Sequence, residues 1–160
     1  MGDGPPFEAW YEREHPRVFV AMLAMTGNRD LAADVTDEAF ARALQHWRRV
    51  GAMTSPGGWT YRVAVNLAHR RARRAHLEQR LLRHLRPPEP LEQSTGEVWT
   101  LVRALPERQR LAVVLRYIAD LTEPDIAQVM NVTRGTVAAT LAAARRSLGN
   151  ALEEPVEEQQ

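Results

Sequence analysis

Residues 121–148, LTEPDIAQVMNVTRGTVAATLAAARRSL, decide the fold of this chain, because they predict two helices joined by a tight turn. Thr122, followed three residues later by Asp125, resembles a capping box at the start of the first helix. Asn131 stands where a tight turn needs a residue that tolerates left-handed φ, and Thr133 caps the second helix. Two helices joined in this way form a helix-turn-helix, whose second helix can enter a major groove of DNA.

Apolar residues recur at helical spacing on both predicted helices. The first helix carries Ile126, Val129 and Met130, and the second carries Val137, Leu141, Ala144, Leu148 and Leu152. This spacing predicts one buried face on each helix. A helical hairpin inside an ordinary bundle would show the same spacing, so the pattern alone leaves that alternative open.

The composition of the 160 residues limits the classes of protein to consider. The chain is 44% hydrophobic, which is enough for a core, and it contains no cysteine. Disulfides and thiolate zinc sites are therefore excluded, and a reducing compartment fits. Apolar runs fall far short of the ~20 residues of a membrane span, and the N-terminus lacks a signal-peptide pattern. We expect a cytoplasmic, soluble protein with no membrane partner.

A net charge of +1 conceals strong segregation of charge along the chain. Residues 1–40 contain eight acidic residues and three arginines, whereas residues 70–86 contain seven arginines and one acid, Glu78. All 21 basic residues are arginine, which suits contacts to phosphate. This asymmetry predicts one surface for nucleic acid and another for a different partner.

The predicted fold class is all-α, with two small helical domains joined by a short proline-rich linker. We expect a first domain at 1–85, a linker at 86–96, a helix-turn-helix domain at 97–152 and an acidic tail at 153–160. Three prolines and a glycine mark the linker.

Helix starts and stops are predicted from caps, prolines and glycines. Pro16 is expected to start a second helix rather than interrupt one, Gly27-Asn28 to end it, and Asp30 to cap the next. That helix should bury a stripe of Leu31, Val35, Ala39, Leu44 and Trp47. Pro56 fits the first turn of a helix that continues through Trp59 into the arginine-rich segment. The predicted helices span 5–14, 16–26, 97–104, 107–119, 123–130 and 134–152, besides the two that follow Asp30 and Pro56.

The helix from Trp59 onward carries two stripes at ~100° per residue. Trp59, Val63 and Leu67 form an apolar seam. Beside the seam runs a stripe of hydrogen-bond donors, here called the donor stripe: Arg62, Asn66, His69, Arg73, His76 and Arg80, flanked by Arg70, Arg71 and Arg74. A solvated basic face is the simpler interpretation, but the near-absence of acids favours a helix that follows a nucleic-acid backbone.

Three segments together carry a resemblance to a known family. They are MTGNRDLAADVTDEAFARALQHW, SPGGWTYRVAVNLAHRRARR and LPERQRLAVVLRYIADLTEPDIAQVMNVTRGTVAATLAAARRSL. The chain resembles a small two-domain bacterial RNA polymerase sigma factor of the extracytoplasmic-function (ECF) group. The resemblance covers nearly the whole chain, with two separate motifs in the right order.

The resemblance implies a sigma factor that binds core RNA polymerase and directs promoter-specific initiation. The acidic helix of the first domain would bind the clamp helices of the polymerase through Asp34, Asp37, Glu38, Phe40 and Arg42. The implied partners are core RNA polymerase and promoter DNA, with an anti-sigma factor as a further candidate. We expect no cofactor, no metal and no small-molecule substrate.

Contacts to the promoter −10 element would come from the loop before Trp59 and the helix after it. The residues implied are Gly51, Thr54, Ser55, Arg62, Asn66, His69, Arg70, Arg73 and Arg74. Extruding a base costs a few kcal/mol, so a snug loop pocket and nearby phosphate contacts must offset it. Trp59 and Tyr61 are candidate stacking platforms, although core packing is the favoured role for Trp59.

The second domain would contact the −35 element through Thr133, Arg134, Thr136, Thr140, Arg145 and Arg146. Here the chain departs from the family, which usually reads close to GTVKSRLHRAR where this sequence has GTVAATLAAAR. Ala138, Ala139, Ala142 and Ala143 replace groups that would contact bases or phosphates. Without about three such groups, at ~1–3 kcal/mol each, binding should be weaker by several kcal/mol. The −35 interaction is therefore weak, restricted to shape and methyl groups, or absent.

An enzyme finds little support in this sequence. The five histidines form no HExxH motif or i, i+4 pair, and no glycine-rich phosphate loop is present. Two alternatives to a sigma factor stay open. One is a stand-alone helix-turn-helix regulator, and the other is a sigma-like protein that acts mainly through protein–protein contacts.

Overall fold

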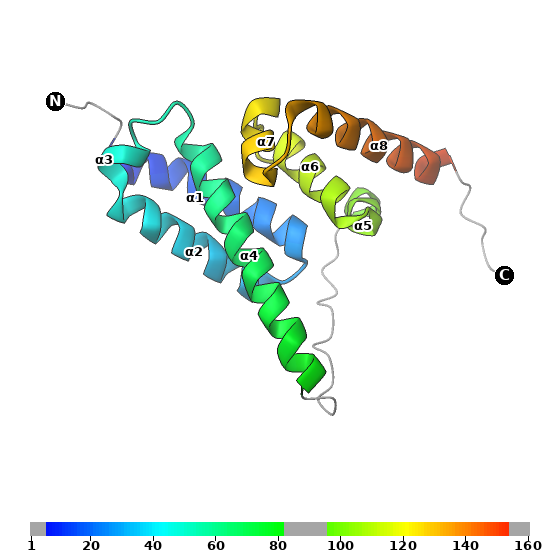
Figure 1. Ribbon diagram of the computed structural model, residues 1–160, viewed down its shortest axis with the longest axis horizontal. Coiled ribbons are helices and arrows are strands. Elements are labelled where there is room, and N and C mark those ends of the chain that lie inside the picture. Colours follow the sequence, from blue (N-terminus) through cyan, green and yellow to red (C-terminus); the bar gives the residue numbers. More distant parts are fainter. Residues whose placement is uncertain (1–5, 82–95, 154–160) are drawn as a thin grey trace.

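The computed structural model describes residues 6–81 and 96–153, and Figure 1 shows helices α1–α4 beside helices α5–α8. Every regular element within these two ranges is a helix, which confirms the predicted fold class. Of the predicted linker only Gly96 is described, and the predicted tail beyond Glu153 lies outside the described residues. The helices are α1 (Phe7–Thr26), α2 (Arg29–Gln45), α3 (Trp47–Val50), α4 (Pro56–Leu81), α5 (Glu97–Ala104), α6 (Glu107–Tyr117), α7 (Glu123–Met130) and α8 (Arg134–Glu153).

Helix α1 runs without interruption through Pro16, so the predicted break at this residue is wrong. Trp10 before the proline and Met22 after it are both buried in the same core, and their packing holds the two halves in line. Pro16 lies on the exposed side, where water can satisfy the carbonyl that its missing N–H leaves unpaired. The helix ends as predicted at Gly27, which has a φ of 64° and donates its N–H to Leu23 O over 2.8 Å.

Helix α2 is capped by Asn28, so the prediction of Asp30 as its cap is wrong. The Asn28 side-chain oxygen accepts the Leu31 N–H at 2.9 Å, while Asp30 lies in the first turn. The helix ends at Gln45, and Trp47 begins the separate helix α3. The predicted buried stripe was wrong at Leu44, which is 55% exposed. The buried face of α2 instead consists of Ala32, Val35, Thr36, Ala39, Phe40 and Ala43.

Helix α4 begins at Pro56, as predicted, and packs across α1 and α2. Its buried residues are Gly58, Thr60, Tyr61, Ala64, Val65, Leu67 and Ala68. Trp59 and Val63, from the predicted apolar seam, are half-buried against the core. From residue 72 to 81 every residue is exposed, and this end of the helix projects beyond the others in Figure 1.

The helix-turn-helix has the predicted caps and turn. Thr122 Oγ1 accepts the Asp125 N–H at 3.4 Å, and Thr133 Oγ1 accepts the Thr136 N–H at 3.1 Å. Asn131 has the left-handed φ of 54° that the turn requires. Helix α6 ends at Tyr117, two residues before the predicted end. Ile126, Val137 and Leu141 are fully buried and join α7 and α8 in one core.

The two halves of the molecule also pack against each other. Helix α7 lies on α4, and α6 lies on α1. No pattern in the sequence predicts this contact. Among the described residues, no helix combines the length and apolar character needed to cross a bilayer.

Tyr61 supplies a test of the first domain's core. The residue is 1% exposed, and its hydroxyl has no hydrogen-bond partner among the described residues. Because a buried unpaired hydroxyl is costly, Tyr61→Phe is expected to raise the free energy of unfolding by about 1 kcal/mol in urea titrations. Exposed Tyr11 gives the matched control, Tyr11→Phe, which should change stability little.

The same substitution predicts a change in pH dependence. Burial, reinforced by Glu14, raises the pKa of Tyr61 above the ordinary value of 10. The folded state therefore favours the neutral phenol. The contribution of this group to the free energy of unfolding is fully present below pH 10 and is lost as the pH rises above 10. Tyr61→Phe should lose less stability than the wild type between pH 10 and pH 11. A destabilised variant would instead mean that the hydroxyl has a partner.

Candidate nucleic-acid interface

The acidic face of α2 is tied to α4 by arginine. The side chains of Asp34 and Asp37 are 72% and 69% exposed, whereas Glu38 is 33% exposed and forms ion pairs with both Arg42 and Arg71. Arg71 Nη1 also lies 3.5 Å from Asp34 Oδ2. Arg71 thus faces α2 and not the donor stripe that it flanks in sequence.

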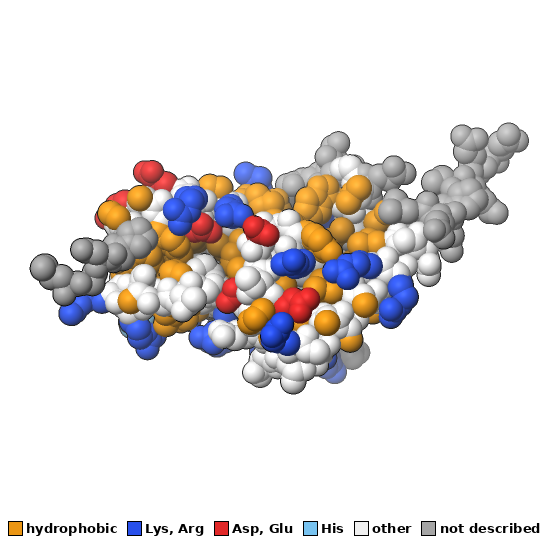
Figure 2. Space-filling view, turned by 90° about the horizontal axis from the view of Figure 1, so that it is seen from above, with side chains coloured by type: hydrophobic (Ala, Val, Ile, Leu, Met, Phe, Trp, Pro, Cys, Tyr) orange, Lys and Arg blue, Asp and Glu red, His pale blue; other side chains and the backbone are white. Residues whose placement is uncertain are grey.

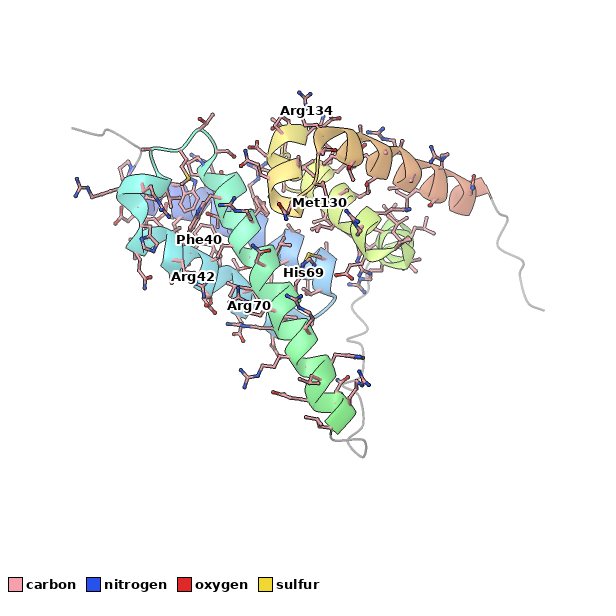
Figure 3. The ribbon with its side chains drawn as sticks, viewed as in Figure 1. Phe40, Arg42, His69, Arg70, Met130 and Arg134 are labelled. Atoms are coloured by element: carbon pink, nitrogen blue, oxygen red, sulfur yellow. The ribbon has the colours of Figure 1, made fainter. Side chains whose placement is uncertain are left out.

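Phe40 does not reach the surface, so it is the one predicted polymerase contact whose side chain is not accessible in the described part of the chain, and its contact with polymerase stays a prediction. It is 2% exposed, and its ring centroid lies 5.0 Å from that of Trp10 and 5.2 Å from that of Tyr11. Figure 3 shows the residue inside the first domain. Burial of an aromatic ring at this position supports the helix that presents the acids. The other four predicted residues, Asp34, Asp37, Glu38 and Arg42, have accessible side chains.

The loop from Gly51 to Ser55 is shaped by close contacts. A Cβ on Gly51 would lie 2.9 Å from the Trp47 ring, so a larger residue cannot fit there without a shift. Ser55 Oγ accepts the Gly58 N–H at 3.1 Å and caps α4. Thr54 is exposed. Three residues of this loop are predicted to contact DNA: Gly51, Thr54 and Ser55. Within the described part of the chain, Thr54 is the one whose side chain neither packs against the loop nor caps a helix.

A cleft of about 280 Å³ lies beside this loop. Trp59, which is half-buried, forms part of its lining, while Tyr61 is excluded from it by burial in the core. Trp59 can therefore reach a base placed in this cleft and stack on it, whereas Tyr61 cannot. The lining residues are Met53, Thr54, Ser55, Gly58, Trp59, Arg62, Asp125 and Gln128.

The donor stripe on α4 divides into two groups. Arg62 shares the first cleft with residues of α7, and a second cleft of about 460 Å³ is lined by His69, Ala72, Arg73, His76 and Glu107. Arg70 points to the other side of α4 from His69 (Figure 3), and exposed Arg74 pairs with Glu78 at 3.1 Å. Asn66 is exposed. Sequence reasoning missed Glu107, Asp125 and Gln128, because contacts between domains leave no local pattern.

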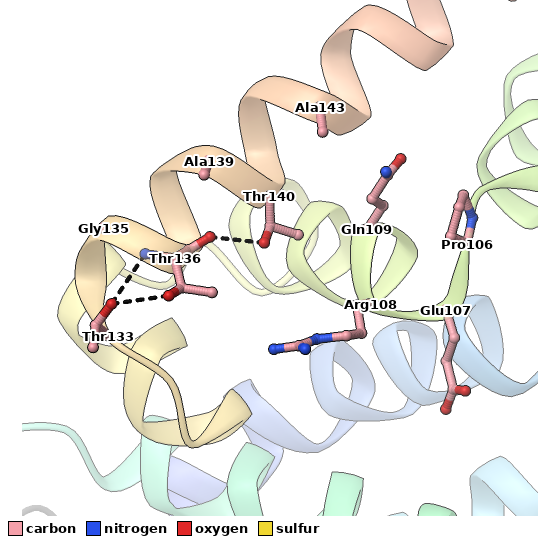
Figure 4. A pocket seen from close by; sticks show the side chains of 10 residues that line it. All are labelled: Pro106, Glu107, Arg108, Gln109, Thr133, Gly135, Thr136, Ala139, Thr140 and Ala143. Atoms are coloured by element: carbon pink, nitrogen blue, oxygen red, sulfur yellow. Dashed lines mark hydrogen bonds between the residues drawn. The ribbon is translucent and has the colours of Figure 1, made fainter.

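Threonines at the predicted −35 surface are used within the fold (Figure 4). Thr133 caps α8, and the Thr140 hydroxyl donates to Thr136 O at 2.7 Å. Arg145 Nε lies 3.0 Å from the Tyr117 hydroxyl. Arg134 and Arg146 are exposed, and Arg134 extends away from α1–α4 (Figure 3). The arginines are therefore the main polar groups that this helix offers to DNA.

The alanines of α8 lie on its accessible side. Ala138 and Ala139 are exposed, and Ala142 and Ala143 are half-buried. Thr136, Ala139, Thr140 and Ala143 line an open cleft of about 770 Å³ between α8 and the start of α6 (Figure 4). Figure 2 shows arginines separated by hydrophobic and acidic side chains over one face of the molecule, with no continuous basic patch among the described residues of that face.

Two models of one protein family match this chain. The sigma-70 region 2 model matches residues 10–78, and the sigma-70 region 4 model matches residues 95–148. The first range contains the acidic face of α2 and most of the donor stripe of α4, and the second contains the helix-turn-helix. The chain belongs to the sigma-70 family, and the relatives described next assign it to the extracytoplasmic-function (ECF) group.

Individual relatives agree with this assignment. The ECF RNA polymerase sigma factor SigC of Mycobacterium tuberculosis is 29% identical over 157 residues, covering 92% of this chain and 83% of that protein. SigW of Bacillus subtilis is 24% identical over 166 residues, with 92% and 89% covered. A solved structure of the sigma factor RpoE from Bartonella quintana, in complex with the anti-sigma factor NepR, superposes with a TM-score of 0.76. It is 16% identical and covers 95% of this chain and 98% of that one, which shows a shared fold.

The outward arginines of α4 generate a prediction. Replacing Arg70 and Arg74 by Ala is expected to weaken binding of single-stranded DNA and to flatten its dependence on salt. The slope of log K against log salt should fall by roughly 0.7 for each phosphate that is no longer neutralised, or about 1.4 for two. Fluorescence anisotropy across a salt series measures this slope.

Arg13 and Arg17 on α1 supply the control for this experiment. Both are exposed, and their replacement by Ala removes the same charge from a different face. The control should keep a slope close to that of the wild type. An unchanged slope in the Arg70/Arg74 variant would mean that these side chains do not contact phosphate.

Proposed function

We propose that this protein is a sigma factor that binds core RNA polymerase and directs promoter-specific transcription initiation. The observation that carries the proposal is the pairing of sigma-70 regions 2 and 4, in order, over most of the chain. A stand-alone helix-turn-helix regulator would need only the second of these regions. Under this proposal the protein acts in the cytoplasm. An anti-sigma factor is a further candidate partner.

The proposed polymerase contact is the face of α2 that carries Asp34, Asp37, Glu38 and Arg42. Asp34 lies 3.5 Å from Arg71 and Asp37 lies 2.8 Å from His15, yet both side chains are mostly exposed, so a basic partner surface can reach them. Glu38 is held between two arginines and contributes mainly to the shape of this face. Complementary charge of this kind increases association rate and selects the partner.

The proposed −10 contact combines the loop cleft with α4. Thr54 and Trp59 border a space beside the start of the helix, and Arg62, Asn66, His69, Arg70, Arg73 and Arg74 continue from it along the helix. A base could stack or be enclosed in the cleft while arginines contact the backbone on either side. Stacking contributes about 1–3 kcal/mol per base, which matches the cost of unstacking it.

A second candidate function is a sigma-like protein that acts mainly through protein contacts. The observation that favours it is the alanine face of α8, which lacks donors for DNA bases. A partner helix could pack against this face as well as DNA could. The two candidates differ in whether promoter DNA is bound at all by the polymerase complex.

Charge reversal on α2 tests the proposed polymerase contact. Asp34→Arg with Asp37→Arg is expected to reduce co-purification with core RNA polymerase by at least about 10-fold. The two substitutions replace exposed negative charges by positive charges, which a basic partner surface would repel. Glu38 is left in place as the partner of Arg42 and Arg71, while the substitutions remove the contacts of Asp34 with Arg71 and of Asp37 with His15. A pull-down with purified proteins provides the readout, and circular dichroism monitors helicity.

Glu8→Arg with Glu12→Arg is the matched control. Both glutamates are exposed on α1, and the change in net charge is the same. This variant should bind polymerase nearly as well as the wild type. Equal binding by the α2 variant and the wild type would refute the proposed contact.

The alanines of α8 predict that specificity depends on the first domain. Scrambling the −35 element should reduce transcription by the reconstituted holoenzyme only slightly, since methyl groups contact little besides thymine. Ala138→Lys, Thr140→Arg and Ala143→Arg together should tighten binding and make transcription depend on the −35 element. Abolition of wild-type transcription by the scrambled element would show that this helix does recognise it.

A further inference from the structure

Arg71 lies where the buried face of α4 ends. Ala64 and Ala68 precede it by seven and three residues, so all three lie on the same side of the helix. Both alanines are buried where α4 packs on its neighbours, of which α2 is one. Arg71 is half-buried, whereas the other four arginines between residues 70 and 80 are exposed. The packing that buries the alanines therefore also places this guanidinium against α2.

The Arg71 guanidinium bridges two acids of α2 through different nitrogens. Its Nη1 lies 3.5 Å from Asp34 Oδ2, and its Nη2 donates to Glu38 Oε2. Arg42 Nη2 donates to the other oxygen of Glu38. Asp34, Glu38 and Arg42 follow one another at four-residue spacing, so they lie in a row along one side of α2. With Arg71 between the two acids, the row alternates in charge.

From this geometry we infer that Arg71 is a positioning residue for polymerase binding, which holds the carboxylates of Asp34 and Glu38 in the orientation that the partner meets. The inference rests on the proposed function, because that function assigns this face of α2 to core RNA polymerase. Arg71 belongs to the arginine-rich segment of the sequence, yet it acts on protein recognition and not on DNA. The polymerase surface thus depends on α4 as well as on α2.

Holding the acids in place has two opposite effects on binding. A carboxylate that is already oriented loses little side-chain freedom when the partner arrives, which lengthens the lifetime of the complex. The positive charge of Arg71 also reduces the negative potential of this face, which slows the encounter with a basic surface. A positioning role is therefore expressed in the dissociation rate, while the charge is expressed in the association rate.

Arg71→Ala tests the inference through the kinetics of binding to purified core RNA polymerase on a biosensor surface. The dissociation rate constant should rise by at least about 5-fold, because each of two side chains ordered in advance contributes a factor of roughly 2 to 10. The association rate constant should stay the same or rise. An unchanged or smaller dissociation rate constant would overturn the inference, the smaller one by showing that Arg71 competes with polymerase for the acids.

The split between the two rates excludes a merely structural role. A variant that is partly unfolded has fewer molecules able to bind, which lowers the apparent association rate but leaves the dissociation rate of the bound ones unchanged. Arg71→Lys keeps the charge without the planar fork, so it should give an intermediate dissociation rate. Exposed Arg17 on α1 supplies the matched control, because Arg17→Ala removes the same charge from another helix and should leave the dissociation rate close to that of the wild type.

A double-mutant cycle tests whether Arg71 acts through the two acids. In a background of Asp34→Asn with Glu38→Gln, Arg71→Ala should cause little further change in the dissociation rate constant, since the groups that it holds are already neutral. An equal rise in both backgrounds would show that Arg71 acts by another route, and the inference would be wrong.

Binding of single-stranded DNA gives a readout that does not involve polymerase. Arg71→Ala should keep the wild-type slope of log K against log salt, because its guanidinium is paired with α2 and not with phosphate. A slope that falls by roughly 0.7, as for one phosphate that is no longer neutralised, would overturn the inference.

The inference and the proposed function can fail separately. A wild-type protein that does not bind core polymerase would refute the proposed function, and the positioning role with it. A wild-type protein that binds, with the same dissociation rate constant as Arg71→Ala, would refute the positioning role alone.

Discussion

The packing of α4 against α1 and α2 is the interaction on which the other surfaces depend. Tyr61, Ala64, Val65 and Ala68 are buried there, and they fix the rotation of a 26-residue helix about its own axis. Once that rotation is set, every other side chain of α4 has a direction. A single rigid element thus presents a core face, a face toward α2 and a face toward the second domain.

Arg71 shows how closely these faces are connected. It comes from the arginine-rich helix and forms ion pairs with Asp34 and Glu38 on the helix proposed to contact polymerase. While the Arg71 side chain pairs with these two carboxylates, it cannot also bind a phosphate group. The net charge of the segment is therefore a poor measure of what it offers to DNA, because one of its arginines is committed to the fold.

The features that could be predicted from sequence are those that depend on residues within one turn of each other, namely helix caps and tight turns. Thr122, Asn131 and Thr133 act within one turn of the backbone, so their caps and the left-handed turn occur where expected. Pro16 and Leu44 were misjudged because tertiary packing decides whether a helix continues and which side it buries. Phe40 falls at a family contact position, yet its burial depends on the rings of Trp10 and Tyr11 from another helix. Contacts between the domains, such as that of Glu107 with His69, have no sequence period at all.

The alanines of α8 have a consequence for the entropy of recognition. Alanine has the highest intrinsic helix propensity and no side-chain rotamers to restrict. A helix with Ala138, Ala139, Ala142 and Ala143 on its accessible side is therefore preorganised, and it has little conformational freedom to lose when a partner covers it. Such a surface suits recognition by shape, where close approach of two backbones matters more than the number of donors.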